Sequence, residues 1–161
     1  MERMVEPWLR GPLPDVSPFL APLLYSFQQA REDLAAHTAG LTDAQIWGRG
    51  SIGFHLRHIA GSTTRLMQYL QGLPLDAGQL AALDAESQPS GPARDVLLAE
   101  IDRVFREAEN VIRRLDPATL ADPRTVGRSH LPTTVIGLLT HIAEHTQRHV
   151  GQVITAARLL R

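Results

Sequence analysis

Four long stretches of this 161-residue chain carry apolar residues at the three- and four-residue spacing of an amphipathic helix. Gly and Pro residues lie between the stretches and stop each helical pattern. The spacing predicts long helices over about 18–38, 51–71, 93–115 and 133–159. Chains with four such helices bury their apolar stripes against one another. The sequence therefore predicts an all-α protein built as a four-helix bundle.

The segments between these helices predict shorter features. Short helical turns are expected over 42–47 and 75–86. Residues 116–132 contain three Pro and one Gly and show no convincing alternation of apolar and polar residues, so an ordered loop is expected there. Ser17, with Pro18 after it, is suited to cap the first long helix, and Thr133 or Thr134 is suited to cap the last.

The length fits a single domain over residues 1–161, in which residues 1–17 form an irregular N-terminal arm because Pro recurs along it. The net charge is −1, all the positive side chains are Arg, and no basic block stands out, which argues against nucleic-acid binding. The chain has no Cys, which excludes disulfides, thiolate ligands and a cysteine nucleophile.

No apolar run is long enough to span a bilayer, and Met1–Arg10 lacks the continuous apolar core of a signal peptide. We therefore expect a cytoplasmic protein without a membrane partner.

Five of the seven His residues fall into two clusters. His141, His145 and His149 follow one another at four-residue intervals in the last predicted helix, and His55 and His58 lie in the second. Side chains four residues apart on a helix lie one above the other, close enough for two imidazoles to share a metal ion. A lone His on an apolar stripe is more often a satisfied core residue, but two at this spacing with a second pair elsewhere favour metal binding.

Helical periodicity ranks the candidates within each cluster. His145 and His149 lie in or at the edge of the apolar arc of their helix, and His141 lies on its flank. In the other helix His55 is nearer the apolar arc and His58 is on the flank. Periodicity alone therefore leans weakly to His55, but a bundle helix contacts two neighbours and the flank can also face the interior.

Two other metal motifs fit less well. The string from His141 to His145 matches the His-x-x-Glu-His pattern of one protease class, but the pattern is short and Glu144 is on the polar side. A carboxylate-bridged di-iron bundle needs two Glu-x-x-His pairs, which the chain does not supply. A mononuclear site with three His ligands fits better, and such a site should lose its metal below about pH 6.

The strings Gly53-Phe-His-Leu-Arg-His58-Ile-Ala-Gly61 and His141-Ile-Ala-Glu-His145-Thr-Gln-Arg-His149-Val-Gly-Gln152 resemble the DinB-like superfamily of four-helix metal proteins. The likeness extends to the group often called YfiT-like metal-dependent hydrolases and covers most of the chain. It implies that His58, His145 and His149 bind a divalent metal, because an apolar-Ala pair follows the ligand of the second helix as it follows His58. His55 and His141 are then neighbours of the metal and less favoured as ligands.

The resemblance also implies a function. Relatives include metal-dependent hydrolases and enzymes that transfer a low-molecular-weight thiol, so a small-molecule substrate, with such a thiol as one option, is expected. Zinc is the favoured ion, and nickel, iron or copper also suit imidazole ligands. Glu144 and His141 are the candidate catalytic bases, and a homodimer is expected. A non-enzymatic metal-binding or structural helical module is the alternative.

Overall fold

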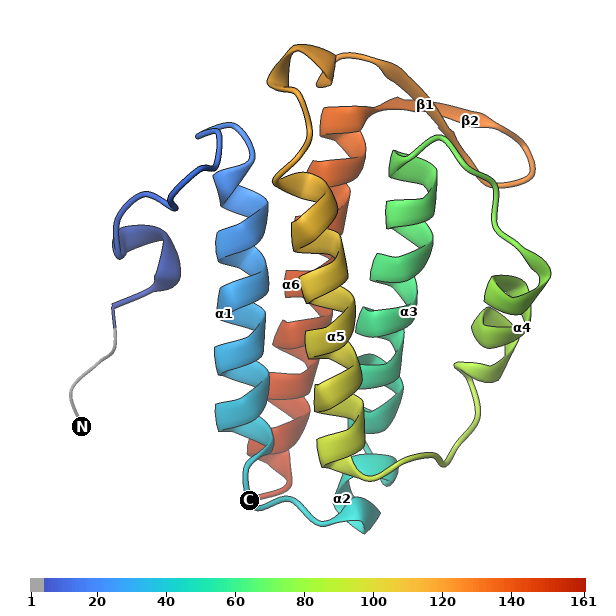
Figure 1. Ribbon diagram of the computed structural model, residues 1–161. Coiled ribbons are helices and arrows are strands. Elements are labelled where there is room, and N and C mark those ends of the chain that lie inside the picture. The colour runs from blue at the N-terminus through green and yellow to red at the C-terminus, as the bar shows by residue number, and fades with distance from the viewer. Residues whose placement is uncertain (1–4) are drawn as a thin grey trace.

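The computed structural model describes residues 5–161. Its four long helices are α1 (Ala21–Thr38), α3 (Ile52–Leu70), α5 (Arg94–Ile112) and α6 (Val135–Leu159), and they stand side by side (Figure 1). Helices α1 and α3 each pack against both α5 and α6. The prediction of a mainly helical chain is confirmed for the described residues. The first four residues of the predicted N-terminal arm lie outside them.

The apolar stripes of the long helices meet in one core. Phe27 of α1 and Phe105 of α5 stack at its centre, with ring centroids 4.2 Å apart and planes 13° from parallel. Both rings are fully buried, as are Ile59 of α3 and Val153 of α6. Stacked aromatic rings at this separation add to the stability gained from area burial. This core fixes the rotation of each helix about its axis and so decides which flank of α3 faces α6.

Shorter elements connect the long ones. A 3₁₀ turn, η1 (Pro7–Leu9), lies in the N-terminal arm and packs against α1. Helix α2 (Asp43–Trp47) precedes α3, and α4 (Ala77–Ala85) lies on the outer side of α3, away from α1 (Figure 1). Both α2 and α4 begin with a capping box, in which the cap side chain and a Gln three residues later each bind the other's backbone N–H.

The predicted caps have mixed outcomes. The Thr134 side chain accepts a hydrogen bond from the backbone N–H of Gly137, which confirms the cap of α6. The first long helix starts three residues later than predicted, at Ala21 instead of Pro18. Ser17 accepts hydrogen bonds from the backbone N–H groups of Leu20 and Ala21 through its carbonyl, so residues 18–20 form a turn that leads into α1.

The prediction of a loop over 116–132 is wrong. A 3₁₀ turn, η2 (Pro117–Thr119), is followed by an antiparallel hairpin of β1 (Pro123–Val126) and β2 (Leu131–Thr134). Each strand has four residues and contains a Pro, which hides the alternation expected of a strand. The hairpin lies at the end of the molecule where α6 begins (Figure 1).

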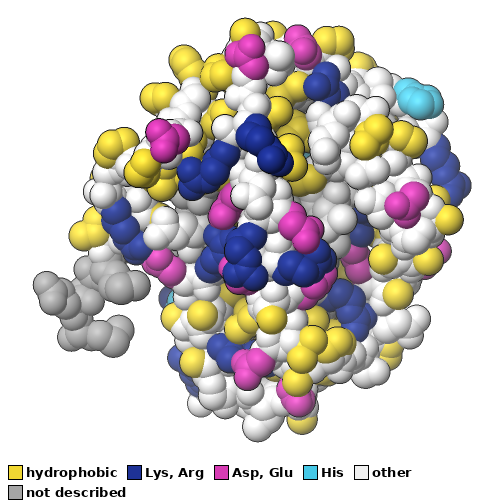
Figure 2. Space-filling view, in the orientation of Figure 1, with side chains coloured by type: hydrophobic (Ala, Val, Ile, Leu, Met, Phe, Trp, Pro, Cys, Tyr) yellow, Lys and Arg dark blue, Asp and Glu magenta, His cyan; other side chains and the backbone are white. Residues whose placement is uncertain are grey.

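Arg and acidic side chains are interspersed on the face formed by α1 and α5 (Figure 2). Arg31 of α1 binds both Asp102 and Glu109 of α5, at 2.8 and 2.6 Å. The opposite charges therefore pair across this face and do not form a patch of one sign. Among residues 5–161, no helix is both long and apolar enough to cross a membrane.

Candidate metal centre

Three imidazoles converge between α3 and α6. His145 and His149 lie one turn apart on α6, and His58 lies opposite them on α3. One ring nitrogen of each lies within 4.8 Å of the others. The ring centroids of His145 and His149 are 4.6 Å apart, and that of His58 is 5.1 Å from the first and 4.5 Å from the second. All three side chains are half-buried, so the cluster is at the edge of the core and reachable from solvent.

The contacts of α3 with α6 show why His58, and not His55, joins this group. Both side chains face α6, but the ring of His58 lies beside those of both His145 and His149, whereas the ring of His55 lies beside that of His149. Periodicity weakly preferred His55 because it ranks residues by their distance from the apolar arc and does not show which residue of α3 stands level with the pair on α6. The grouping of His58 with His145 and His149 agrees with the set that the sequence resemblance implies.

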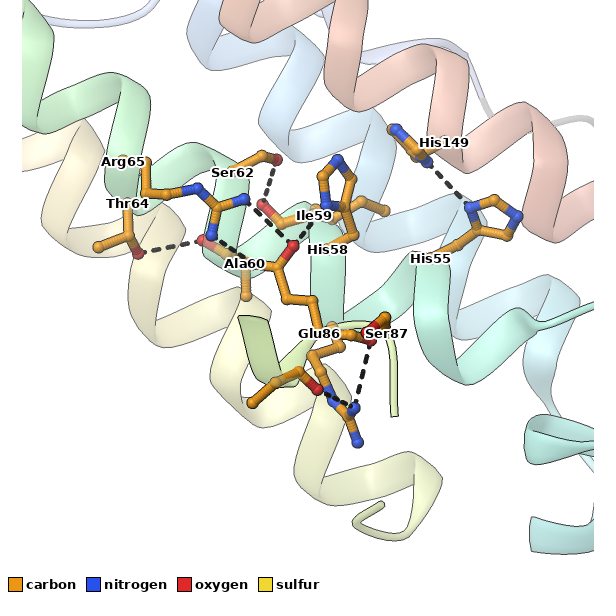
Figure 3. Close-up of polar contacts among 12 residues, drawn as sticks. His55, His58, Ile59, Ala60, Ser62, Thr64, Arg65, Glu86, Ser87 and His149 are labelled. Carbon is orange, nitrogen blue, oxygen red and sulfur yellow. Dashed lines mark hydrogen bonds and ion pairs between the residues drawn. The ribbon is translucent and has the colours of Figure 1, made fainter. Parts of the chain in front are cut away.

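A carboxylate binds the Nδ1 atom of the His58 ring. The Nδ1 atom of His58 is 2.6 Å from Oε2 of Glu86, which directly follows α4. Arg65, two turns after His58 on α3, binds both oxygens of the same carboxylate. Figure 3 shows Glu86 lying between the two side chains. The side chain of Glu86 is only 5% exposed, so this carboxylate is buried with two partners.

His55 and His141 flank the cluster on opposite sides. The Nδ1 atoms of His55 and His149 are 2.9 Å apart (Figure 3). The ring of His141 is 5.3 Å from that of His145, and its Nδ1 is 2.6 Å from Oε1 of Glu144. Both members of this last pair are exposed. The two predicted catalytic candidates therefore lie together at the solvent edge, outside the three-His group.

The cluster favours neutral rings. Burial, and then the neighbouring rings, lower the pKa of His149 to about 4 and also lower the pKa of His55 and of His145. For Glu86, burial raises the pKa, but hydrogen bonds from His58 and Arg65 outweigh it and the net pKa is lowered. The lowered pKa values of His145 and His149 favour uncharged rings on α6, and neutral imidazole is the form that binds metal.

The donor set fits a divalent ion. Tetrahedral zinc with bonds of about 2.0–2.1 Å places its ligand nitrogens about 3.4 Å apart. The three nitrogens already lie within 4.8 Å of one another, on side chains whose rings can rotate. An ion held by these three residues alone would keep at least one coordination position for a small molecule, and the half-buried location leaves that side reachable from solvent.

Fold and site together define a mainly helical protein with a three-His cluster, suited to a divalent metal, between two packed helices. The chain belongs to the DinB superfamily, whose family pattern matches residues 26–153. The matched region contains all five clustered His residues and Glu86. No curated protein gives a significant match to this chain.

Sequence reasoning missed Glu86 and Arg65. Glu86 was included only as the end of a short predicted helix, and it meets His58 across 28 residues of sequence. The available signal was Arg65 itself, because a single Arg on a helix segment that is otherwise uncharged needs an acidic partner when it is buried. No local pattern identifies which of the acidic residues that partner is.

Proposed function

We propose that this DinB-superfamily chain, as a four-helix bundle, holds one divalent metal ion through His58, His145 and His149 and uses it to transform a small molecule. The observation that carries the proposal is the convergence of three imidazoles from two helices at a half-exposed position. Structural zinc sites are closed by four protein ligands, whereas catalytic sites keep a position open. The open position favours an enzyme over a purely structural module.

When bound, the ion would act as a Lewis acid that lowers the pKa of a water or thiol or polarises a carbonyl. The surrounding residues would orient the ligands and move protons. His55 contacts His149 on one side, and His141, whose Nδ1 faces Glu144, adjoins His145 on the other. His141 therefore keeps its Nε2 free to accept a proton from a substrate at the solvent edge, with the carboxylate stabilising the charge that develops.

The reaction is metal-dependent hydrolysis or transfer of a low-molecular-weight thiol to a small electrophile. Zinc is the ion we favour, since imidazole ligands and tetrahedral coordination suit it. The two reactions differ in one requirement. Thiol transfer turns over only when the thiol is supplied, whereas hydrolysis needs water alone.

Elemental analysis of purified and zinc-reloaded protein tests the proposal. We expect about one ion per wild-type chain, because a three-ligand site holds a single ion. Its loss is expected in both His58→Ala and His149→Ala. His130→Ala, which removes an exposed His on the hairpin turn, is the matched control and should keep the metal. Wild-type protein that remains metal-free after reloading would contradict the proposal and favour a structural module.

Substrate assays on the loaded protein then separate the two reactions. Small electrophiles and small esters or amides are offered with and without a low-molecular-weight thiol. Turnover that depends on the thiol supports the transferase, and turnover without it supports the hydrolase. In either case His58→Ala should abolish turnover.

A further inference from the structure

The contact between His58 and Glu86 has a definite proton arrangement. An ionised carboxylate only accepts hydrogen bonds, so the 2.6 Å contact from Oε2 to Nδ1 requires a proton on Nδ1 of His58. A neutral imidazole carries one proton. Its Nε2 therefore keeps a free lone pair, which is the electron pair that a metal ligand needs.

Arg65 keeps the carboxylate in this role. Arg is a donor only and is always charged, and it binds both oxygens of Glu86 in a forked arrangement (Figure 3). The pair fixes the carboxylate in the plane where Oε2 faces His58. Both partners come from the same helix, α3, seven residues apart, so the spacing between His58 and Arg65 is set by two turns of helix.

A second set of contacts places Glu86 against α3. Arg57 donates hydrogen bonds to the carbonyls of Ala85 and Ser90, at 3.0 and 2.8 Å. Its guanidinium stacks 4.6 Å from the ring of Trp47, whose Nε1 donates to the carbonyl of Pro92 at 2.9 Å. Arg57 and Trp47 thus bind the backbone of the segment 85–92 to α3 and α2 at several points.

Two glycines make room for this arrangement. A Cβ at Gly61 would overlap the carboxylate of Glu86, and a Cβ at Gly91 would overlap Arg57 and Trp47. Gly61 lets the buried carboxylate lie directly on the surface of α3, one turn from His58. The absence of a side chain at both positions is what permits so close an approach.

We propose that Glu86, held by Arg65 and by the 85–92 segment, is a positioning residue of the metal site that fixes His58 in the tautomer with Nε2 free. This inference rests on the proposed metal site. Carboxylates that bind the outer nitrogen of a metal-ligating His orient the ring and raise the basicity of the ligand. Glu86 acts through His58 and does not itself contact the ion.

The variant Glu86→Gln tests this role with almost no change in volume. Arg65 can only donate, so it takes the amide oxygen and leaves the NH₂ group facing Nδ1 of His58. Nδ1 must then accept, and the ring proton moves to Nε2, which blocks the metal. The control is Glu109→Gln. It removes a carboxylate that also binds an Arg, Arg31, in a half-buried ion pair away from the His cluster.

The first readout is ring ¹⁵N NMR of metal-free protein at about pH 8, well above the ordinary imidazole pKa of about 6.5. The His58 signals are assigned with His58→Gln. We expect the proton on Nδ1 in wild type and in Glu109→Gln, and on Nε2 in Glu86→Gln. A wild-type His58 with its proton on Nε2 would overturn the inference without recourse to any variant.

The second readout is zinc affinity by competition with a chelator. We expect Glu86→Gln to bind zinc about 10- to 100-fold more weakly, as for other residues that support a metal ligand. Glu109→Gln should match wild type. Unchanged affinity and an unchanged tautomer in Glu86→Gln would overturn the inference while the metal site stands. A tautomer change in a protein that binds no zinc would support the positioning role of Glu86 and reject the metal site.

Discussion

The Nδ1 atom of His55 lies 2.9 Å from the Nδ1 atom of His149, so the two rings share one proton along this contact. If His149 donates it, Nε2 of His149 is free for the metal, and His55 plays the part for His149 that Glu86 plays for His58. His58 and His149 would then each be oriented through Nδ1 by a different side chain, Glu86 for the first and His55 for the second.

Removal of His55 should therefore weaken the site without destroying it. We expect His55→Phe, which keeps an aromatic ring of similar shape, to reduce zinc affinity about 10-fold or somewhat more. Competition titration with a chelator measures this change, and His149→Phe should instead lose binding altogether. Equal losses in the two variants would show that His55 is itself a ligand.

Metal binding should stabilise the folded chain. Free zinc at about 100 times its Kd adds about 2.7 kcal/mol to the free energy of unfolding, because the ligand set exists only in the folded state. For a chain of this size that corresponds to a rise in Tm of about 5–10 °C. Differential scanning calorimetry measures the rise, and His145→Ala should show none. A rise of the same size in His145→Ala would place the stabilising ion elsewhere.

The metal-free protein should lose stability on acidification. The pKa of His149 is lowered to about 4, and the pKa values of His55 and His145 are also lowered from the ordinary 6.5. Below pH 6.5 the unfolded chain therefore takes up protons before the folded chain does. The stabilisation is present above about pH 6.5 and is lost as the pH falls toward 4.

Since these rings are half exposed, we expect a loss on the order of 1 kcal/mol for His149, well below the full value of its pKa shift. Denaturant unfolding at a series of pH values measures it. The variant His149→Gln should have a flatter profile than wild type, and identical profiles would contradict the assignment to this ring.

The same pKa shifts alter the expected pH of metal release. Imidazoles with an ordinary pKa would release the ion below about pH 6. Rings that stay neutral at lower pH resist protonation and so keep the ion to a lower pH. We expect zinc to be released between about pH 4 and pH 6. Equilibrium dialysis against buffers of decreasing pH measures this release. Release that is complete at about pH 6.5 would argue that the cluster is more open to water than the structure indicates.

A substitution at Gly61 tests the close approach of the Glu86 carboxylate to α3 without changing a His side chain. In Gly61→Ala the new methyl group would overlap Glu86, so the carboxylate must shift away from His58. We expect a stability loss of about 1–3 kcal/mol, as for other overpacked sites, together with weaker zinc binding. Denaturant unfolding and chelator competition measure the two effects.

The control for this variant is Gly151→Ala. Gly151 is a helical position of α6 where a Cβ would meet nothing within 4 Å. Replacing Gly by Ala inside a helix should stabilise it by about 0.5–1 kcal/mol. If Gly61→Ala behaves like this control, the close approach of Glu86 to α3 has no energetic importance.

The parts of the structure that sequence predicted are those with a local, repeating cause. The four long helices were predicted because apolar residues recur through each of them, and the pair His145 and His149 followed from helical spacing alone. The grouping of His58 with this pair came from the family resemblance, because periodicity ranks residues about one helix axis and does not show which of them stands level with His145 and His149 on α6.

The parts that sequence missed depend on contacts between distant segments. The β1–β2 hairpin has strands of four residues, too short for alternation to show, and Pro123 and Pro132 argued against strands. Glu86 reaches Arg65 across 21 residues of sequence, which include the end of α3 and all of α4. Its position follows from the hydrogen bonds that Arg57 donates to backbone carbonyls of the segment 85–92.

The cluster draws its rings from α3 and α6, and the contact between His55 and His149 spans 94 residues of sequence. Neither helix alone offers three imidazoles to one ion. Unlike a zinc finger, in which the metal organises the chain, this protein must close a long loop and dock α6 against α3 before the ligands exist as a set. Metal binding should therefore be a late event in folding. The rate at which refolding chains take up the metal would report the rate at which α6 docks against α3.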